Sequence, residues 1–491
     1  MSTGARSLTQ PASTGRRRRG RRRPPPLAVV VALAIALPGL ATAQSSVPAS
    51  PLDAYVAEGL RANLGLVQRR LVVERGDAAV RQARGSFLPS LALDARYSER
   101  RGAVLNIGDF VNPAYDALNQ MLGRPAFPTD VDARLPLAQE TRLRVVQPLY
   151  NPAIAAGHAI ARAGRRADDA ALGAAARALA AQIRTAYLGY ASAQRVVELY
   201  EATLPVVAEN VRANERLVAN GKATPDVVFR ARAERSEVEQ QLLAASERRD
   251  AARRAFNFLL DRDLEAAIDD VPDSALGASF AATESVSYDE ALARAREARE
   301  ELRQVDAGSE AARLQGRLAR AAYRPSVVAA LDYGVQGNEY RFARDRDFAL
   351  LTVSAQWNLF NGGRDAARAE QATLDTRRLE TQRAELDRRI ALEVRQAYES
   401  SRVAREAIAV ADARLAASER SYALVARRYG EGMATLVELL DARTAFTAAG
   451  LNRIVTTYDY WTRRVELERA AALYALPSPA EPSTHTSTPT R

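Results

Sequence analysis

The chain has 491 residues and a formal net charge of +10, but eight arginines and no acid fall within residues 1–43. The basic charge therefore belongs to the start of the chain, and a nucleic-acid partner is not indicated. There are no cysteines and two histidines, which excludes disulfides and thiolate ligands and argues against a histidine metal site or a Ser-His triad.

The first 43 residues have the order of a secretory signal peptide. An arginine-rich segment precedes the apolar stretch 27–37, and Ala41-Thr42-Ala43 follows it. This order is typical of a leader with an A-x-A cleavage site, and the apolar stretch is shorter than the ~20 residues of a membrane-spanning helix. The sequence predicts cleavage after Ala43 and export of the remaining chain.

The rest of the chain resembles itself at a shift of 236 residues in its early part and of 210–211 residues further on. The matching segments are Phe87–Ser90 with Tyr323–Ser326, Leu149–Asn151 with Leu359–Asn361, and Gly221–Thr224 with Gly432–Thr435. They predict a first repeat over 44–270, a second over 271–475 and a disordered Pro/Ser/Thr-rich tail over 476–491. The first repeat carries an insertion within 98–140 that is rich in Gly, Pro and Asn, which predicts a loop.

Each repeat is expected to contain two strands, a long helix and a return helix. The first has strands at about 88–98 and 141–150 and helices at 152–219 and 226–260, and the second has strands at 325–336 and 348–360 and helices at 362–428 and 436–473. At 1.5 Å per residue each long helix would extend about 100 Å. Seven-residue spacings recur in both long helices, and these heptad positions include Ile390, Val394 and Ala397 in the second and Asn214 in the first. This repeat predicts supercoiled antiparallel hairpins.

The predicted strands alternate between apolar and polar residues. In 351–359, Leu, Val, Ala, Trp and Leu alternate with Thr, Ser, Gln and Asn. A half-buried soluble strand shows the same pattern, but aromatic residues occur where the chain enters and leaves each hairpin, as at a membrane interface. These residues are Phe87, Tyr150, Tyr323, Trp357 and Phe360. Four strands cannot close a barrel, so we expect copies to assemble, three of them giving twelve strands.

Together these features resemble the TolC family of outer-membrane efflux proteins, over about 52–473. The local matches are Phe87–Ser90, Gln147–Asn151, Trp357–Gly363, Tyr429–Ala442 and Val455–Tyr460. The resemblance implies a mixed α/β membrane protein: a homotrimer with a twelve-stranded outer-membrane barrel continued by a periplasmic α-helical tunnel. It implies a passive exit duct of a tripartite efflux or type I secretion system, which is not an enzyme and has no cofactor. Its partners would be outer-membrane lipid, a periplasmic adaptor (a membrane fusion protein) and an inner-membrane pump of the RND, ABC or MFS type. The substrate and the pump class stay open.

The resemblance also implies roles for residues at the two helical turns. Glu438 and Asp441 would ring the pore constriction, although a helix N-terminus favours such acids in any case. Tyr429 and Asp226 would belong to the periplasmic gate, with a helix N-cap as the alternative for Asp226. The family's basic gate residue corresponds to Ala434, so either Arg427 or Arg428 replaces it or the gate is held differently. The adaptor would dock at the hairpin tips, which are Gly221, Ala223, Thr224, Gly432, Ala434 and Thr435.

One alternative is a periplasmic coiled-coil scaffold or adaptor without a pore. An adaptor would show one helical hairpin rather than two. A scaffold would not need two alternating strand pairs with aromatic residues at their bases.

Overall fold

The computed structural model describes residues 51–99, 105–132, 134–135, 137–337 and 346–476. The predicted signal peptide lies outside these residues, as does the predicted tail beyond Leu476. Within the described ranges, none of the helices combines the length and the hydropathy needed to cross a bilayer.

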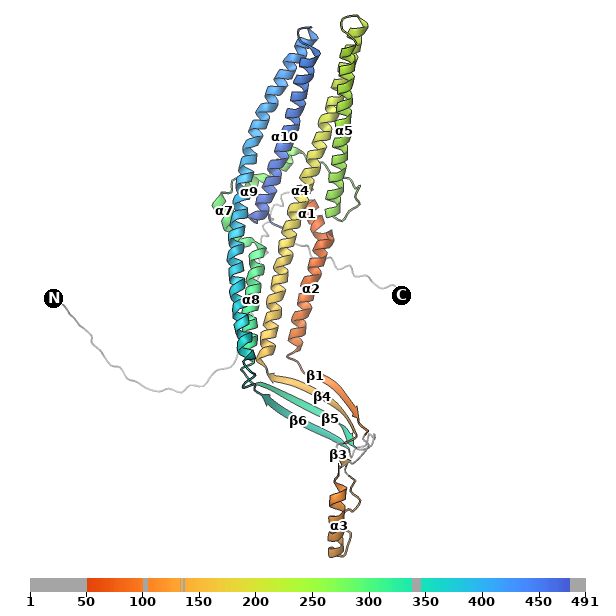
Figure 1. Cartoon of the computed structure of the whole chain (residues 1–491), viewed down its shortest axis with the longest axis vertical. Helices are drawn as coiled ribbons and strands as arrows, with labels where there is room; N and C mark the ends of the chain where they lie inside the picture. The colour runs from red at the N-terminus through yellow and green to blue at the C-terminus, as the bar shows by residue number, and fades with distance from the viewer. Residues whose placement is uncertain (1–50, 100–104, 133, 136, 338–345, 477–491) are drawn as a thin grey trace, which may run out of the picture. The chain divides into compact units, whose positions relative to one another are not determined.

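One order of elements occurs twice along the chain: a pair of helices, two strands, a long helix and a return helix (Figure 1). The first set is α1 (Pro51–Ala62), α2 (Leu64–Gly85), β1 (Ser90–Tyr97), β4 (Gln139–Tyr150), α4 (Pro152–Ala219) and α5 (Asp226–Leu259). The second is α7 (Tyr288–Ala298), α8 (Glu300–Ala321), β5 (Ser326–Gly337), β6 (Asp347–Gln356), α9 (Arg364–Gly430) and α10 (Leu436–Ala470). A short helix, α6 (Asp273–Glu284), lies between the two sets.

The ends of these elements follow local chemistry. α4 begins after Asn151, whose side chain accepts a hydrogen bond from the Ala153 amide, with Pro152 in the first turn. β6 ends earlier than the predicted 360, because Gln356 already pairs with the first residue of β5. Beyond Gln356 the chain has no strand to pair with.

The four long strands form one antiparallel sheet in the order β1-β4-β5-β6. β1 pairs with β4 and β5 pairs with β6, and the β4–β5 pair joins the two hairpins. β1 and β6 are the edges, each with one neighbour among the described strands.

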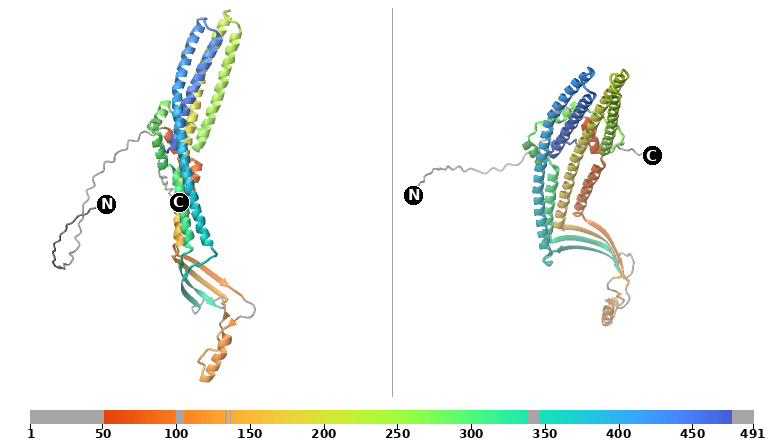
Figure 2. Two further views of the ribbon diagram at one scale, coloured as in Figure 1. Left: turned by 60° about the vertical axis from the view of Figure 1, so that its left-hand side comes forward. Right: turned by 45° about the horizontal axis from the view of Figure 1, so that its top comes forward.

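The long helices continue from one end of this sheet (Figures 1 and 2). α4 has 68 residues and packs against α5, and α9 has 67 residues and packs against α10. Of the predicted heptad positions, Ile390, Val394 and Ala397 in α9 are buried. Side chains of α1, α4, α5, α6 and α10 form the largest core, in which Tyr187 and Phe256 are fully buried.

The insertion predicted as a loop contains a helix, so that expectation was wrong in part. α3 (Gly108–Leu122) lies between two short strands, β2 (Leu105–Asn106) and β3 (Arg134–Leu135), which pair with each other. Pro113 lies inside α3, and Gly123 ends it with a left-handed φ of 64°. The Pro and Gly content of 98–140 obscured the helical spacing of the apolar residues between these breakers.

Candidate functional site

The sheet has an exposed apolar face. The register aligns Leu93 with Leu143 and Tyr333 across three strands. Leu351 lies on the same face, since it pairs with Leu331. Leu93 is 70% exposed and Leu351 69%, although large apolar side chains in a soluble protein are usually covered.

The opposite face carries a network of charges. Arg142 contacts Glu140 at 2.8 Å and Asp94 at 3.4 Å, and Arg144 lies 3.5 Å from Asp332 on the next strand. Asp332 is only 4% exposed. The sheet therefore presents one apolar and one charged surface, the arrangement of a wall between lipid and water.

The register brings the predicted aromatic residues to one end of the sheet. β1 and β5 begin at this end, and β4 and β6 finish there. Phe87 and Tyr323 precede the first two strands, and Tyr150, Trp357 and Phe360 end or follow the other two. All five are exposed, between 42% and 84%. Trp357 Nε1 donates to the Tyr323 carbonyl at 3.1 Å, which links the two ends of the second hairpin.

Both helical turns are built in the same way. Gly221 and Gly432 have φ values of 67° and 75°, in the left-handed region that favours glycine. The residue after each glycine donates to a carbonyl in the last helical turn: Lys222 to Leu217 at 2.9 Å, and Met433 to Arg428 at 2.8 Å. These are Schellman motifs, so the turn residues proposed for docking sit in two matching, well-defined loops.

The second turn leads into a capping box. Thr435 Oγ1 accepts from the Glu438 amide, and both the amide and the hydroxyl of Thr435 donate to the Glu438 carboxylate. The Thr435 backbone hydrogen bond, followed by the hydroxyl bond, lowers the pKa of Glu438. Glu438 thus acts in the helix cap that the sequence left as its alternative role. Asp441, one turn later, is exposed.

At the predicted gate, Tyr429 binds a residue that the sequence did not single out. Its hydroxyl donates to Asn214 Oδ1 at 2.7 Å, which joins the end of α9 to α4. Asn214 is fully buried and also donates to Asn210. Burial raises the pKa of Tyr429, an effect that the bond to Asn214 partly offsets. The sequence offered one sign of this role: Asn214 is a polar residue at a predicted heptad position, where most residues are apolar.

Asp226 makes its contacts within and next to its own turn. Its carboxylate accepts from the Thr224 hydroxyl and lies 3.8 Å from Arg230 in the next turn of α5. The N-cap of α5 is Pro225, so the N-cap role considered for Asp226 was wrong. Arg428 stabilises its own turn by donating to the Met433 carbonyl at 3.1 Å.

A second contact that the sequence did not predict joins the return helices α5 and α10. Arg443 of α10 forms an ion pair with Glu234 of α5, and the two side chains are 9% and 11% exposed. The two helical hairpins are therefore tied together at two places near their tips.

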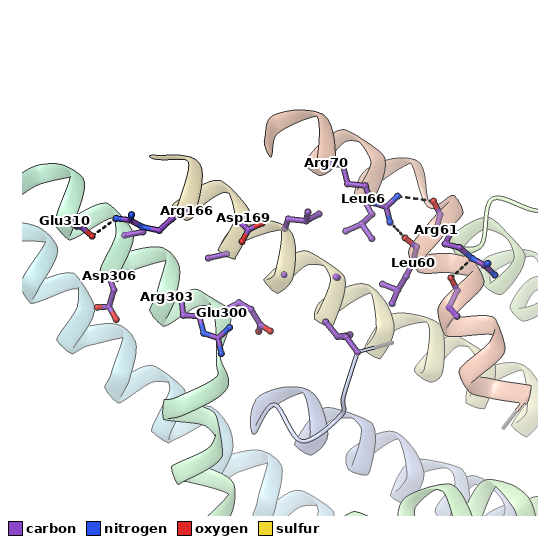
Figure 3. Close-up of a pocket in the computed structure, with 17 residues that line it drawn as sticks. Leu60, Arg61, Leu66, Arg70, Arg166, Asp169, Glu300, Arg303, Asp306 and Glu310 are labelled. Atoms are coloured by element: carbon purple, nitrogen blue, oxygen red, sulfur yellow. Dashed lines mark hydrogen bonds and ion pairs between the residues drawn. The ribbon is translucent and has the colours of Figure 1, made fainter. Parts of the chain in front are cut away.

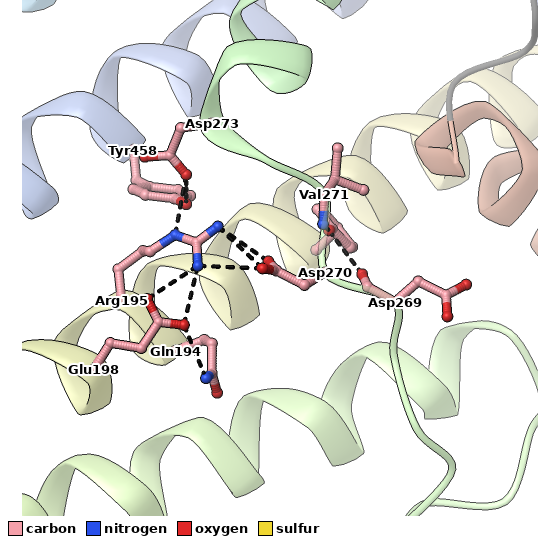
Figure 4. A network of polar contacts seen from close by, with 9 residues as sticks. Gln194, Arg195, Glu198, Asp269, Asp270, Val271, Asp273 and Tyr458 are labelled. Atoms are coloured by element: carbon pink, nitrogen blue, oxygen red, sulfur yellow. Dashed lines mark hydrogen bonds and ion pairs between the residues drawn. The ribbon is translucent and has the colours of Figure 1, made fainter. Parts of the chain in front are cut away.

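Further from the tips, a polar network joins α4 to α10 (Figure 4). Arg195 contacts Glu198, Asp270 and Asp273 at 3.0–3.1 Å. The Tyr458 hydroxyl donates to Asp273 at 2.9 Å, and burial raises the pKa of Tyr458 above its usual range. This network therefore joins α4 and α10 to the start of α6, away from the tips.

A cavity of about 780 Å³ lies between α1, α2, α4 and α8 (Figure 3). Its walls carry charges of both signs, from Arg61, Arg70, Arg166, Arg303, Asp169, Glu300, Asp306 and Glu310. Arg166 pairs with Glu310 at 2.5 Å, and Glu300 pairs with Arg177 at 2.7 Å. Within the described ranges, no three His, Asp or Glu side chains gather as metal ligands.

Comparison with known proteins agrees with this geometry. Residues 291–473 match the model of the outer membrane efflux protein family. This part of the chain is an outer membrane efflux protein domain. The resemblance to the TolC family is thereby confirmed over these residues.

Solved structures of outer-membrane channels share the fold. VceC from Vibrio cholerae is 20% identical with a TM-score of 0.67, and the alignment covers 86% of this chain and 95% of that one. CmeC from Campylobacter jejuni is 16% identical with a TM-score of 0.67, covering 86% and 85%. The open state of MtrE from Neisseria gonorrhoeae is 19% identical with a TM-score of 0.65, covering 86% and 88%. No curated protein sequence is similar enough to match.

Proposed function

We propose that three copies of this chain form a passive duct through the outer membrane, the last step of a tripartite efflux or type I secretion system. The efflux family domain supports an outer-membrane exit duct. The observation that carries the proposal is the four-stranded sheet, with one apolar face, one charged face and two edges that no other described strand covers.

Free strand edges in a membrane are costly because lipid cannot satisfy their amide and carbonyl groups. Pairing β6 of one copy with β1 of the next satisfies both edges. Three copies then close a ring of twelve strands. With strands ~4.8 Å apart and tilted ~40°, such a ring is about 24 Å across. That width suits small molecules or an extended polypeptide.

In this assembly Phe87, Tyr150, Tyr323, Trp357 and Phe360 lie at the periplasmic membrane interface. The long helices continue the barrel as a periplasmic tunnel. The hairpin tips at its inner end meet a periplasmic adaptor and an inner-membrane pump, with Glu438 and Asp441 around the constriction. The turn geometry and the family match support these roles.

A periplasmic scaffold without a pore is the weaker reading. It would leave the apolar face of the sheet in water, where Leu91, Leu93, Leu351 and Val353 are each more than 60% exposed. A contiguous patch of this kind marks an interface with lipid or protein.

A matched pair of variants tests the proposal. Leu351→Arg puts a charge on the apolar face, and Thr352→Arg puts the same charge on the opposite face one residue later. An arginine facing lipid costs ~2–4 kcal/mol at the membrane midplane. We expect Leu351→Arg to lower the amount of detergent-resistant trimer in the outer-membrane fraction, judged on unheated gels, and Thr352→Arg to retain it. Equal trimer yields would contradict the proposed orientation of the sheet.

A further inference from the structure

The insertion between β1 and β4 is a small unit held by asparagine side chains. Asn112 exchanges hydrogen bonds with the Val131 backbone, donating and accepting at 2.8 Å. Asn119 donates to the Phe127 carbonyl at 2.7 Å and accepts from two amides of the same returning segment. Gly108 packs so closely on the Val131 carbonyl that no Cβ would fit. α3 and residues 124–132 therefore form one ordered piece.

The other side of α3 is an exposed apolar stripe. Phe110, Ala114, Ala117 and Met121 are spaced by three or four residues and share one face of the helix. Phe110 is 70% exposed and Met121 84%. The two alanines between them let another helix approach closely, because their side chains are small.

The charges of this unit decide between the possible occupants of the stripe. Residues 105–132 contain four aspartates and one arginine. Asp109 and Asp116 are one heptad apart on a different face of α3 from the stripe. An acidic unit is repelled by an anionic lipid surface, whereas another copy of α3 can cover the stripe while its aspartates stay in water.

We propose that the α3 helices of three copies pack stripe to stripe and cap the outer mouth of the duct. This inference rests on the trimer of the proposed function. α3 follows β1 and lies beyond the end of the sheet away from the long helices (Figures 1 and 2). It is about 22 Å long, against a radius of about 12 Å for a twelve-stranded ring. The barrel also holds the three copies together, so their association is effectively intramolecular.

The absence of native cysteine makes disulfide cross-linking a clean test. Ala117→Cys places a thiol in the stripe, and Asp116→Cys places one on the acidic face as the matched control. Each variant of the full chain is purified as a trimer, oxidised with copper phenanthroline and run on denaturing, non-reducing gels. We expect Ala117→Cys to form linked dimers at least tenfold faster than Asp116→Cys. Met121→Asp in the Ala117→Cys background should slow the linkage while trimer yield stays constant.

The outcomes separate this inference from the proposed function. If the cysteine-free protein forms no trimer, both are wrong. If trimers form but the two thiols link at equal rates, the cap alone is wrong. Labelling of Ala117→Cys by a lipid-dissolved maleimide but not by a water-soluble one, in trimers reconstituted in vesicles, would show that lipid covers the stripe and would also overturn the cap.

Discussion

The hydrogen bond between Tyr429 and Asn214 is the most direct tie between the two helical hairpins near their tips. Tyr429→Phe removes the hydroxyl that donates this hydrogen bond. Asn214 Oδ1, whose residue is fully buried, then loses the bond from Tyr429. An unsatisfied buried polar group costs ~1–3 kcal/mol. Free energies of this size change a conformational equilibrium by about 5- to 150-fold, so we expect the untied arrangement of the tips to become that much more populated.

Spin labels can measure this change because the chain has no competing cysteine. Labels at Lys222 and Glu431 report the separation of the two turns, with labelled copies diluted among unlabelled ones. Tyr429→Phe should broaden the distance distribution. Tyr422→Phe is the control: its ring stacks on Phe446, and nothing in the described chain bonds its hydroxyl. If both variants give the wild-type distribution, the hydroxyl does not couple the hairpins.

The pH dependence of the same distance follows from the raised pKa of Tyr429. Phenol hydroxyls ordinarily lose their proton near pH ~10. Since the pKa in the folded protein is higher, the tie is present below that pH and is lost only as the pH rises through the raised value. The label distance should therefore stay constant between about pH 6 and pH 9.

Three further perturbations test other parts of the account. Gly432→Ala should lower the melting temperature, because an alanine at φ 75° costs ~1–2 kcal/mol. Gly430→Ala, at the last residue of α9 with open space around its Cβ, should not lower it. The double variant Glu438→Gln with Asp441→Asn should reduce cation selectivity in planar bilayers, less so at 1 M salt, where the Debye length is only ~3 Å; unchanged selectivity would place these acids away from the constriction. A peptide tag inserted after Thr129 should bind antibody on intact cells, and binding seen only after lysis would reverse the proposed topology.

Much of the fold was predictable because the spacing of the apolar residues and the residues that begin or end helices indicated the same elements. Asn151 and Pro152 mark the start of α4, and Gly221 and Gly432 mark the turns, since only glycine adopts a left-handed φ cheaply. α3 was missed because Pro113 and the surrounding glycines and asparagines favour a loop locally. The tertiary bonds of two asparagines to the returning segment stabilise the helix instead, and no local pattern shows such bonds.

The candidate site was less predictable because it depends on pairs of residues from distant segments. Tyr429 was singled out, but its partner lies 215 positions away along the chain. Arg443 and Glu234 likewise read as ordinary helix-surface charges until the return helices are placed side by side. Glu438 is different, because its partner Thr435 lies only three residues before it. This spacing is the sequence pattern of a capping box.

In the proposed function this chain conducts as a closed assembly of three copies. Protein extracted from the outer-membrane fraction with mild detergent can be weighed intact by native mass spectrometry and then reconstituted in a planar bilayer. We expect particles with the mass of three mature chains and discrete single-channel currents that vanish when the trimer is dissociated by heat. A monomer recovered from the soluble periplasmic fraction, or a membrane trimer that conducts no ions, would contradict it.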